Sequence, residues 1–333
     1  MLRTFERMVA YACEEGVSAI LIAGDMFDTS HTSQLTRNTV LHCIKSNPGI
    51  AFFYLKGNHD EYLIDGLAEE SDRPVNLMLF GEKWSRYECG DVTISGAEHK
   101  GGNGSFDELT TESGKINIVM LHGQICESAE GVEHAIELNS LCGKHIDYLA
   151  LGHIHSFSEG RLDDRGFYCY PGCLEGRGFD ECGPRGFVLL DVDEQKRTVE
   201  RRFIPFASRV IYSVNADVTG CMSTREMIMI AAEALVDAGC DNSSMVRLVL
   251  TGELDAECEK DIPYITAAFA GRYFFFKTVD ETRLKVSMED YLLDESLKGE
   301  FVRIVSEDNS LSDEDKSFIV RYGLRALAGE EAD

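Results

Sequence analysis

The sequence predicts an α/β domain with substantial parallel strand pairing, followed by a smaller α+β unit. In the first half, four short apolar runs each end in polar residues, and helical patterns separate several of them. Strands that alternate with helices favour a parallel sheet. From about residue 206 the pattern becomes strand, helix, strand, short helix, strand. We therefore expect two domains, residues 1–205 and 206–333.

The chain opens with an amphipathic helix and a buried strand. Apolar residues at helical spacing in 1–16 predict the helix, which Gly16 ends. The run "VSAILIAGD" (17–25) suits a strand that is buried on both faces. A second helix is predicted over 33–46, before Pro48.

Three more apolar runs repeat the pattern of a buried strand with a polar tip. They are "IAFFYLKGNHD" (50–60), "KINIVMLHG" (115–123) and "IDYLALGHIH" (146–155). A helix is expected at 131–144, between the last two. The remaining expected elements are antiparallel strands in 166–172, 185–206 and 209–218, a helix in 223–239, strands in 244–254 and 272–279, and two helices in the tail 294–333.

Composition restricts the classes of function. The 333 residues include 32 basic and 58 acidic side chains, a net charge of −26, which disfavours nucleic-acid binding through a broad basic face. The sequence contains 11 cysteines, an odd number, and no CxxC motif. No apolar run approaches the roughly 20 residues that cross a bilayer, and we see no signal peptide. The expectation is a reduced, cytoplasmic protein without a membrane segment.

The polar strand tips contain side chains that bind metals. The carboxyl ends of parallel strands share one edge, so side chains far apart in sequence converge there. Mixed oxygen and imidazole ligands suit Mn, Fe, Zn or Co. A shared carboxylate, here Asp25, can bridge two ions roughly 3.5–4 Å apart, a spacing used for in-line phosphoryl displacement. The expected cluster comprises Asp25, Asn58, His59, His122, His153 and His155.

Each tip also has a purely structural interpretation. "GNHD" is a reasonable polar turn, His122 a reasonable core histidine, and Asp28 a reasonable helix cap. Four strand tips that all carry ligand-type side chains favour the metal site over these separate explanations. The histidines away from the tips receive the structural interpretation: His31, His42, His99, His134 and His145.

Four motifs in this order resemble the calcineurin-like metallophosphoesterase superfamily. They are "GDMFD", "GNHD", "LHG" and "GHIH". With "YPGCLEGRGFDECGPRGF" (170–187) they look most like SbcD-type DNA repair exonucleases, particularly the YhaO-like branch. The resemblance implies a two-sheet α/β/β/α sandwich, a small C-terminal cap, and hydrolysis of DNA phosphodiester bonds with two divalent ions, foremost Mn. It also implies DNA ends as substrate and an SbcC or YhaN-type ATPase partner; a homodimer stays open.

The resemblance assigns a role to each tip residue. Asp25 bridges the two ions. One ion takes Asn58, His122 and His153, and the other takes His155. His59 protonates or stabilises the leaving oxygen, and Asp60 is expected to orient His59. Four arginines near "GHIH" are candidates for phosphate contacts, with Arg177 first and then Arg161, Arg165 and Arg185.

One motif of the family has no counterpart here. The family begins with a strand that carries Asp-x-His, which supplies ligands to the first ion, and no Asp-x-His occurs in this sequence. Either the start is assigned too far downstream, or the chain is truncated with an impaired site. In both cases the strand at 17–25 should lack a neighbour. Other phosphatases and cyclic-nucleotide phosphodiesterases of the superfamily remain alternatives, as does an impaired subunit that only binds a partner.

Overall fold

The computed structural model of the protein describes residues 1–27, 33–60, 73–98, 106–126, 132–255, 257–285, 291 and 294–328. Two compact units make up the chain, Met1–Val210 and Ile211–Asp333. Their boundary lies near the expected residue 205. That the second unit caps the first stays a prediction. Asp28, His31 and His99 lie outside the described residues.

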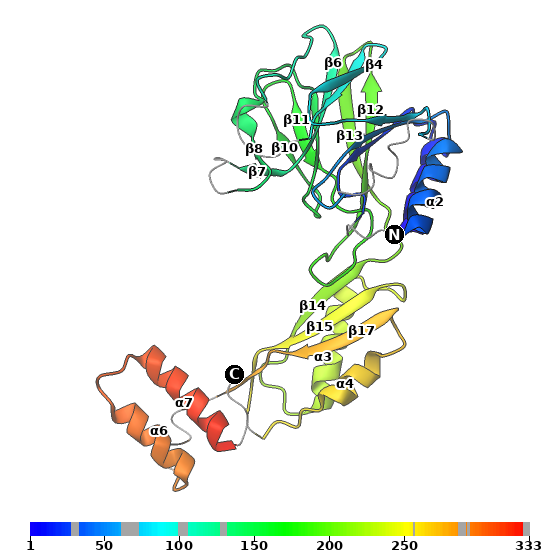
Figure 1. Ribbon diagram of the computed structural model, residues 1–333. Coiled ribbons are helices and arrows are strands. Elements are labelled where there is room, and N and C mark those ends of the chain that lie inside the picture. The colour runs from blue at the N-terminus through cyan, green and yellow to red at the C-terminus, as the bar shows by residue number, and fades with distance from the viewer. Residues whose placement is uncertain are drawn as a thin grey trace. The chain divides into compact units, whose positions relative to one another are not determined.

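The first unit begins with two helices packed on a parallel sheet (Figure 1). Residues alternate across the central strand β2, so Phe52 and Tyr54 pack with the helices while Phe53 and Leu55 face the second sheet. Side chains on both faces of β2 are therefore buried, as its continuous apolar run predicts. The elements are helices α1 (Leu2–Glu14) and α2 (Gln34–Lys45), and strands β1 (Ala19–Ala23), β2 (Ala51–Leu55) and β3 (Leu77–Leu79), in the order β1-β2-β3.

A second sheet of six strands packs against the first. Its middle strands are parallel to one another, and its two edge strands are antiparallel to their neighbours. Phe53, Ile118, Met120 and Tyr148 lie in the core between the sheets. The order is β10 (Ser158–Arg161), β11 (Phe167–Tyr170), β9 (Tyr148–Gly152), β6 (Ile116–His122), β5 (Val92–Gly96) and β4 (Ser85–Cys89). The α/β class and the two packed sheets are thereby confirmed.

The far face of the second sheet corrects one prediction. Instead of a helix over 131–144, the described part contains strand β8 (Ala135–Glu137) and the 3₁₀ turn η2 (Leu138–Ser140). Strand β8 pairs in parallel with β7 (Gln124–Cys126). The apolar residues Ile136 and Leu141 still pack against this sheet, because their burial does not require a helix.

A long hairpin follows, and then the second unit. The hairpin pairs β12 (Gly186–Asp193) with β13 (Thr198–Pro205), and Val188 and Leu190 pack against the core between the sheets. The second unit has a parallel sheet of β14 (Ile211–Asp217), β15 (Met245–Thr251) and β17 (Phe275–Asp280), with helices α3 (Thr224–Asp237) and α4 (Ile262–Phe269). It also contains the short pair β16 (Glu253–Leu254) and β18 (Arg283–Leu284), and helices α6 (Leu297–Glu307) and α7 (Asp313–Ala328). Within the described ranges, no helix is long and apolar enough to cross a membrane.

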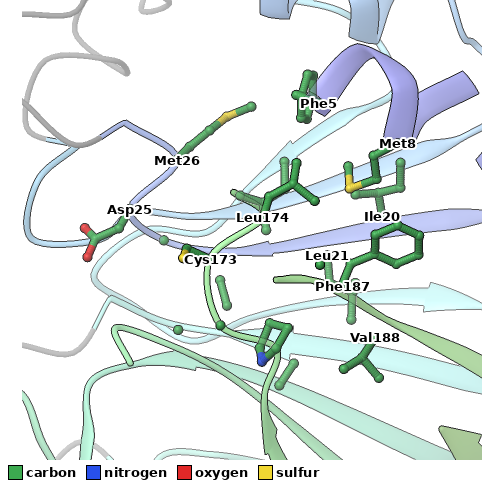
Figure 2. Close-up of a pocket in the computed structure, with 18 of the residues that line it drawn as sticks. Phe5, Met8, Ile20, Leu21, Asp25, Met26, Cys173, Leu174, Phe187 and Val188 are labelled. Atoms are coloured by element: carbon green, nitrogen blue, oxygen red, sulfur yellow. The ribbon is translucent and has the colours of Figure 1, made fainter. Parts of the chain in front are cut away.

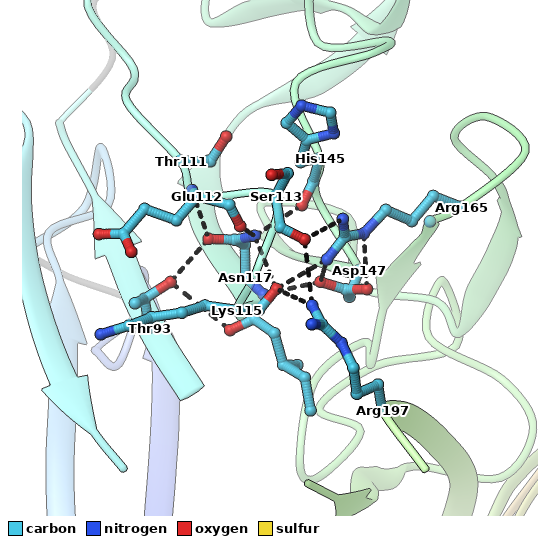
Figure 3. A network of polar contacts seen from close by, with 12 residues as sticks. Thr93, Thr111, Glu112, Ser113, Lys115, Asn117, His145, Asp147, Arg165 and Arg197 are labelled. Atoms are coloured by element: carbon cyan, nitrogen blue, oxygen red, sulfur yellow. Dashed lines mark hydrogen bonds and ion pairs between the residues drawn. The ribbon is translucent and has the colours of Figure 1, made fainter. Parts of the chain in front are cut away.

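A buried polar network joins the starting ends of the strands of the second sheet (Figure 3). The side-chain amide of Asn117 donates to three backbone carbonyls, those of Glu112, Lys115 and His145, while its Oδ1 accepts from the Thr93 hydroxyl at 2.8 Å. Arg165 pairs with Asp147 at 2.8 Å and also donates to the Lys115 carbonyl. This network lies at the opposite end of β6 from His122.

Replacing Asn117 should lower stability without affecting metal binding. Asn117→Ala removes the side-chain donor to three backbone carbonyls and the acceptor of the Thr93 hydroxyl, so we expect a loss of about 2–4 kcal/mol in the free energy of unfolding, measured with urea. The exposed Asn139→Ala is the matched control and should change it by no more than about 0.5 kcal/mol. A loss of metal affinity in Asn117→Ala would contradict the separation of the two strand ends.

Candidate metal centre

Strand tips from both sheets meet at one place. Asp25 follows β1 of the first sheet, His122 ends β6 of the second, and His153 follows β9. One ligand atom from each of these residues lies within 4.8 Å of the others. The imidazole rings of His122 and His153 make an edge-to-face contact with centroids 5.3 Å apart. In the part of the chain that the structure describes, this is the one group of three or more such side chains.

Asn58 adds a fourth donor atom to this group. Its side-chain oxygen Oδ1 lies 2.8 Å from His122 Nε2 and 3.4 Å from His153 Nδ1. Asp25 Oδ2 lies 3.2 Å from the same His122 Nε2. The structure thus brings together the four residues that the resemblance assigns to one ion.

Hydrogen bonding shows which nitrogen of His122 faces the cluster. Nδ1 lies 2.8 Å from the carbonyl oxygen of Ala23, which can only accept, so Nδ1 carries a proton. Nε2 then faces two oxygens, Asn58 Oδ1 and Asp25 Oδ2. A second proton on the ring or a metal ion would satisfy these three acceptor atoms. One carboxylate, one amide oxygen and two imidazoles are a donor set that fits a transition metal.

The charges of the cluster respond to this geometry. Burial alone would raise the pKa of Asp25, but the hydrogen bond and charge of His122 lower it overall. Burial alone would lower the pKa of His122, but Asp25 raises it overall. The pKa of His153 is lowered by burial and by the charge of His122, which favours the neutral ring that binds metals.

The backbone at the tips is strained and closely packed. Asp25 and His153 have φ values of 51° and 98°, a region that residues with a Cβ rarely adopt. A Cβ on Gly152 would lie 1.7 Å from the Ala23 carbonyl oxygen, and one on Gly24 would lie 2.3 Å from His122 Nδ1. Glycine is therefore required at both positions, and the ligands are held by backbone contacts between the sheets.

The loop after β2 contributes differently from the sequence-based expectation. The backbone N–H of His59 donates to Asp25 Oδ1 at 3.0 Å, and the His59 residue is exposed beside the cluster. Asp60 is buried, and its carboxylate accepts from the backbone N–H groups of Met26, Phe27 and Gly57. Asp60 thus joins the loop after β1 to the loop after β2, and an orienting role toward the His59 ring stays a prediction.

His155 lies outside the described cluster. Its Nδ1 is 2.7 Å from Oε1 of Glu181, and its side chain is 46% exposed. Glu181 is itself almost fully buried, and the Arg177 guanidinium donates to the same Oε1 at 3.1 Å. Burial alone would raise the pKa of Glu181, but hydrogen bonds from Arg177 and His155 lower it overall.

The other candidate arginines have structural partners. Arg165 pairs with Asp147 at the far end of the sheet, and buried Arg185 donates to backbone carbonyls that include those of Glu181 and Cys182. Arg161 donates to the carbonyls of residues 163 and 164. These contacts correct the prediction that Arg165 and Arg185 contact phosphate. Arg177 remains a candidate, with a side chain that is 31% exposed.

The structure adds two residues that sequence reasoning missed. The His134 ring lies 6.4 Å from the His153 ring, although the sequence suggested only a structural role. Glu181 binds His155 from a loop without periodic pattern. Neither residue follows an apolar run, so the signal that identified the residues at the strand tips does not apply to them.

A cavity of about 400 Å³ runs beside β1 (Figure 2). Strand β1 pairs with β2 on one side, and no strand among the described residues pairs with its other side. Ile20, Leu21, Phe187 and Val188 line the cavity, and Asp25 lies at one end of it.

Comparisons with known proteins identify the family. Residues 1–195 match the calcineurin-like phosphoesterase superfamily domain. The chain belongs to this superfamily. It is 28% identical over 200 residues to an uncharacterized metallophosphoesterase, YhaO, of Bacillus subtilis, covering 56% of this chain and 48% of the relative. It is 24% identical over 235 residues to the DNA double-strand break repair protein Mre11 of Sulfurisphaera tokodaii, covering 64% of this chain and 59% of the relative. The chain thus spans about half the length of these relatives.

The ion pair in the cluster predicts how metal-free protein responds to pH. His122 has a raised pKa, so its stabilisation is complete below the unfolded value of 6.5 and is lost as the pH rises through the raised value. Asp25 has a lowered pKa, so its stabilisation is present above 3.8 and is lost as the pH falls through the lowered value. The ion pair therefore stabilises the fold most between pH 3.8 and pH 6.5.

Asp25→Asn should remove this dependence. In the presence of a chelator, the difference in unfolding midpoint between the native chain and Asp25→Asn should be largest between pH 3.8 and 6.5 and should shrink above the raised pKa of His122. His42→Gln, on helix α2, is the matched control and should not show this window. A difference that stays constant from acid to alkaline pH would contradict the ion pair.

Proposed function

We propose that the first unit is a metal-dependent phosphodiesterase that acts as a DNA repair exonuclease. The convergence of Asp25, Asn58, His122 and His153 supports this proposal, because the chain belongs to a phosphoesterase superfamily. The finer assignment to DNA rests on the resemblance of the motifs and on the DNA repair protein among its relatives.

The residues divide into two groups of ligands. Asp25, Asn58, His122 and His153 would hold one divalent ion, and Asp25 with His155 would contribute to a second. Manganese is the foremost candidate, with iron, zinc or cobalt as alternatives. When bound, the ions lower the pKa of a water and offset the charge of the phosphate.

Two side chains of the chain would act on the substrate directly, His59 as proton donor and Arg177 as phosphate contact. The exposed His59 sits next to Asp25, and we assign it the proton donated to the leaving oxygen. With a net charge of −26, the chain repels DNA, so binding depends on local cations. Arg177 is the proposed phosphate contact of the chain, and an SbcC or YhaN-type ATPase is the proposed partner.

A second candidate function follows from the position of His155. A two-metal site needs ligands for both ions, and His155 lies outside the cluster that serves the first. The chain of 333 residues would then act chiefly as a partner-binding subunit with an impaired site. Metal stoichiometry and substrate tests separate the two candidates.

We expect the chain to bind one ion tightly and a second weakly. Four protein ligands can hold a transition metal, whereas Asp25 and His155 alone provide two. Metal analysis after dialysis should give about one equivalent of Mn²⁺ per chain, and His122→Ala should reduce it to near zero. His42→Ala, on α2, should retain it. Two equivalents with full nuclease turnover would show that the role of the missing motif is misjudged.

An added strand should complete the site. A chain extended at its amino terminus by an apolar strand that ends in Asp-x-His should pair with the open edge of β1, fill the cavity, and bind the second ion. Manganese-dependent cleavage should appear with that ion. The same extension ending in Ala-x-Ala is the control: it should raise the unfolding midpoint without the second ion or cleavage. Equal activity of the two extended chains would contradict the proposal.

The extended chain also tests the substrate. An exonuclease should shorten linear duplex DNA from its ends and leave covalently closed circles intact. His59→Asn should lower this rate by about 10²- to 10⁴-fold while both ions stay bound. Faster hydrolysis of a phosphate monoester than of any DNA would favour the phosphatase alternative.

A further inference from the structure

Glu181 is an almost fully buried carboxylate in the loop between β11 and β12. Its side chain is 5% exposed. An ionised carboxylate is costly to bury unless donors surround it. Three donors do so: His155 Nδ1 at 2.7 Å and the Arg177 guanidinium at 3.1 Å contact Oε1, and the Arg177 backbone N–H contacts Oε2 at 2.8 Å.

These contacts determine the tautomer of His155. A carboxylate paired with an arginine accepts hydrogen bonds and does not donate them. The proton between the two side chains therefore resides on His155 Nδ1. In the neutral ring, Nε2 then carries the lone pair, and the 46% exposure of the side chain leaves the ring accessible.

The backbone of His155 is held by the same loop. Its carbonyl accepts from the backbone N–H of Cys173 at 3.0 Å and from the Arg185 guanidinium. Arg185 also donates from Nε to the Glu181 carbonyl at 3.2 Å. Buried Arg185 thus connects the backbones of His155 and Glu181, so the ring and its carboxylate are positioned as one assembly.

We propose that Glu181 is a positioning residue that presents Nε2 of His155 as a metal ligand. The inference rests on the metal-dependent function proposed above and specifies how its second ion is held. Histidines that bind metals usually donate their other ring N–H to a carboxylate or a carbonyl, which fixes the ring and its tautomer. His122 shows the same arrangement, with Nδ1 on the Ala23 carbonyl and Nε2 toward the cluster.

The tautomer is the decisive measurement. In metal-free protein labelled with ¹⁵N-histidine, long-range ¹H–¹⁵N spectra should show His155 protonated at Nδ1, with the signal assigned by its loss in His155→Gln. Glu181→Ala should shift His155 toward the Nε2-protonated form. Glu181→Gln keeps a side-chain carbonyl that can accept from Nδ1 and should restore the Nδ1 form in large part.

Zinc binding provides a second readout that does not depend on DNA cleavage. Zn²⁺ titration followed at His155 Nε2 should require about 10- to 100-fold more zinc in Glu181→Ala than in the native chain. Glu175→Ala is the matched control. Glu175 lies in the same loop, but its carboxylate accepts from the Thr4 hydroxyl and from the backbone N–H groups of Ser208 and Arg209.

A purely structural role for Glu181 predicts a different result. Glu181→Ala and Glu175→Ala would then both lower the unfolding midpoint, while His155 would keep its tautomer and its response to zinc. That result would overturn the proposal, as would a native His155 protonated at Nε2. Both outcomes can be observed even if the chain does not act on DNA, so they separate this inference from the proposed function.

Discussion

The site depends on one contact between the two sheets, which is centred on the carbonyl of Ala23. This carbonyl ends β1, accepts from Nδ1 of His122 in the second sheet, and packs against Gly152 at the end of β9. A side chain at residue 152 would push the sheets apart. Because the backbones touch here, the ligands that follow each strand are brought within a few ångströms of one another.

Asp60 extends this constraint to the first sheet. Its buried carboxylate accepts hydrogen bonds from three backbone N–H groups, two in the loop after β1 and one in the loop after β2. Those N–H groups would otherwise be buried without acceptors, which costs free energy. Asp25 and Asn58 therefore stand on two loops tied by one side chain. The strained φ of Asp25 persists because this loop is held at both sides.

The sequence predicts which side chains converge at the candidate centre because a simple pattern encodes them. A buried strand leaves a continuous apolar run, and the polar residues that follow it must lie at the sheet edge. Asp25, Asn58, His122 and His153 all follow this pattern. The role of Asp60 does not follow from this pattern, because its carboxylate accepts from the backbone of a loop that lies more than thirty residues away in sequence. Glu181 and His134 could not be identified from the sequence for the same reason, since they lie in loops whose course is set by tertiary contacts.

The prediction of a helix over 131–144 was wrong because strand pairing overrode the local sequence pattern in this segment. Leu138 and Leu141 stand three residues apart, a helical spacing, yet they also pack when the chain runs as a short strand and a 3₁₀ turn. Pairing of β8 with β7 decides between the two. The close approach of Gly123 to the His134 carbonyl brings these strands together and places His134 near His153.

Two kinds of support hold the histidines of the centre. His122 is oriented by a backbone carbonyl at the junction of the sheets, so its geometry follows from the fold itself. His155 is oriented by Glu181, a side chain from a loop that also carries Arg177. The orientation of His122 is thus a property of the packed sheets, whereas that of His155 depends on the loop that carries Glu181. Changes in that loop can therefore reorient His155 while His122 keeps its position.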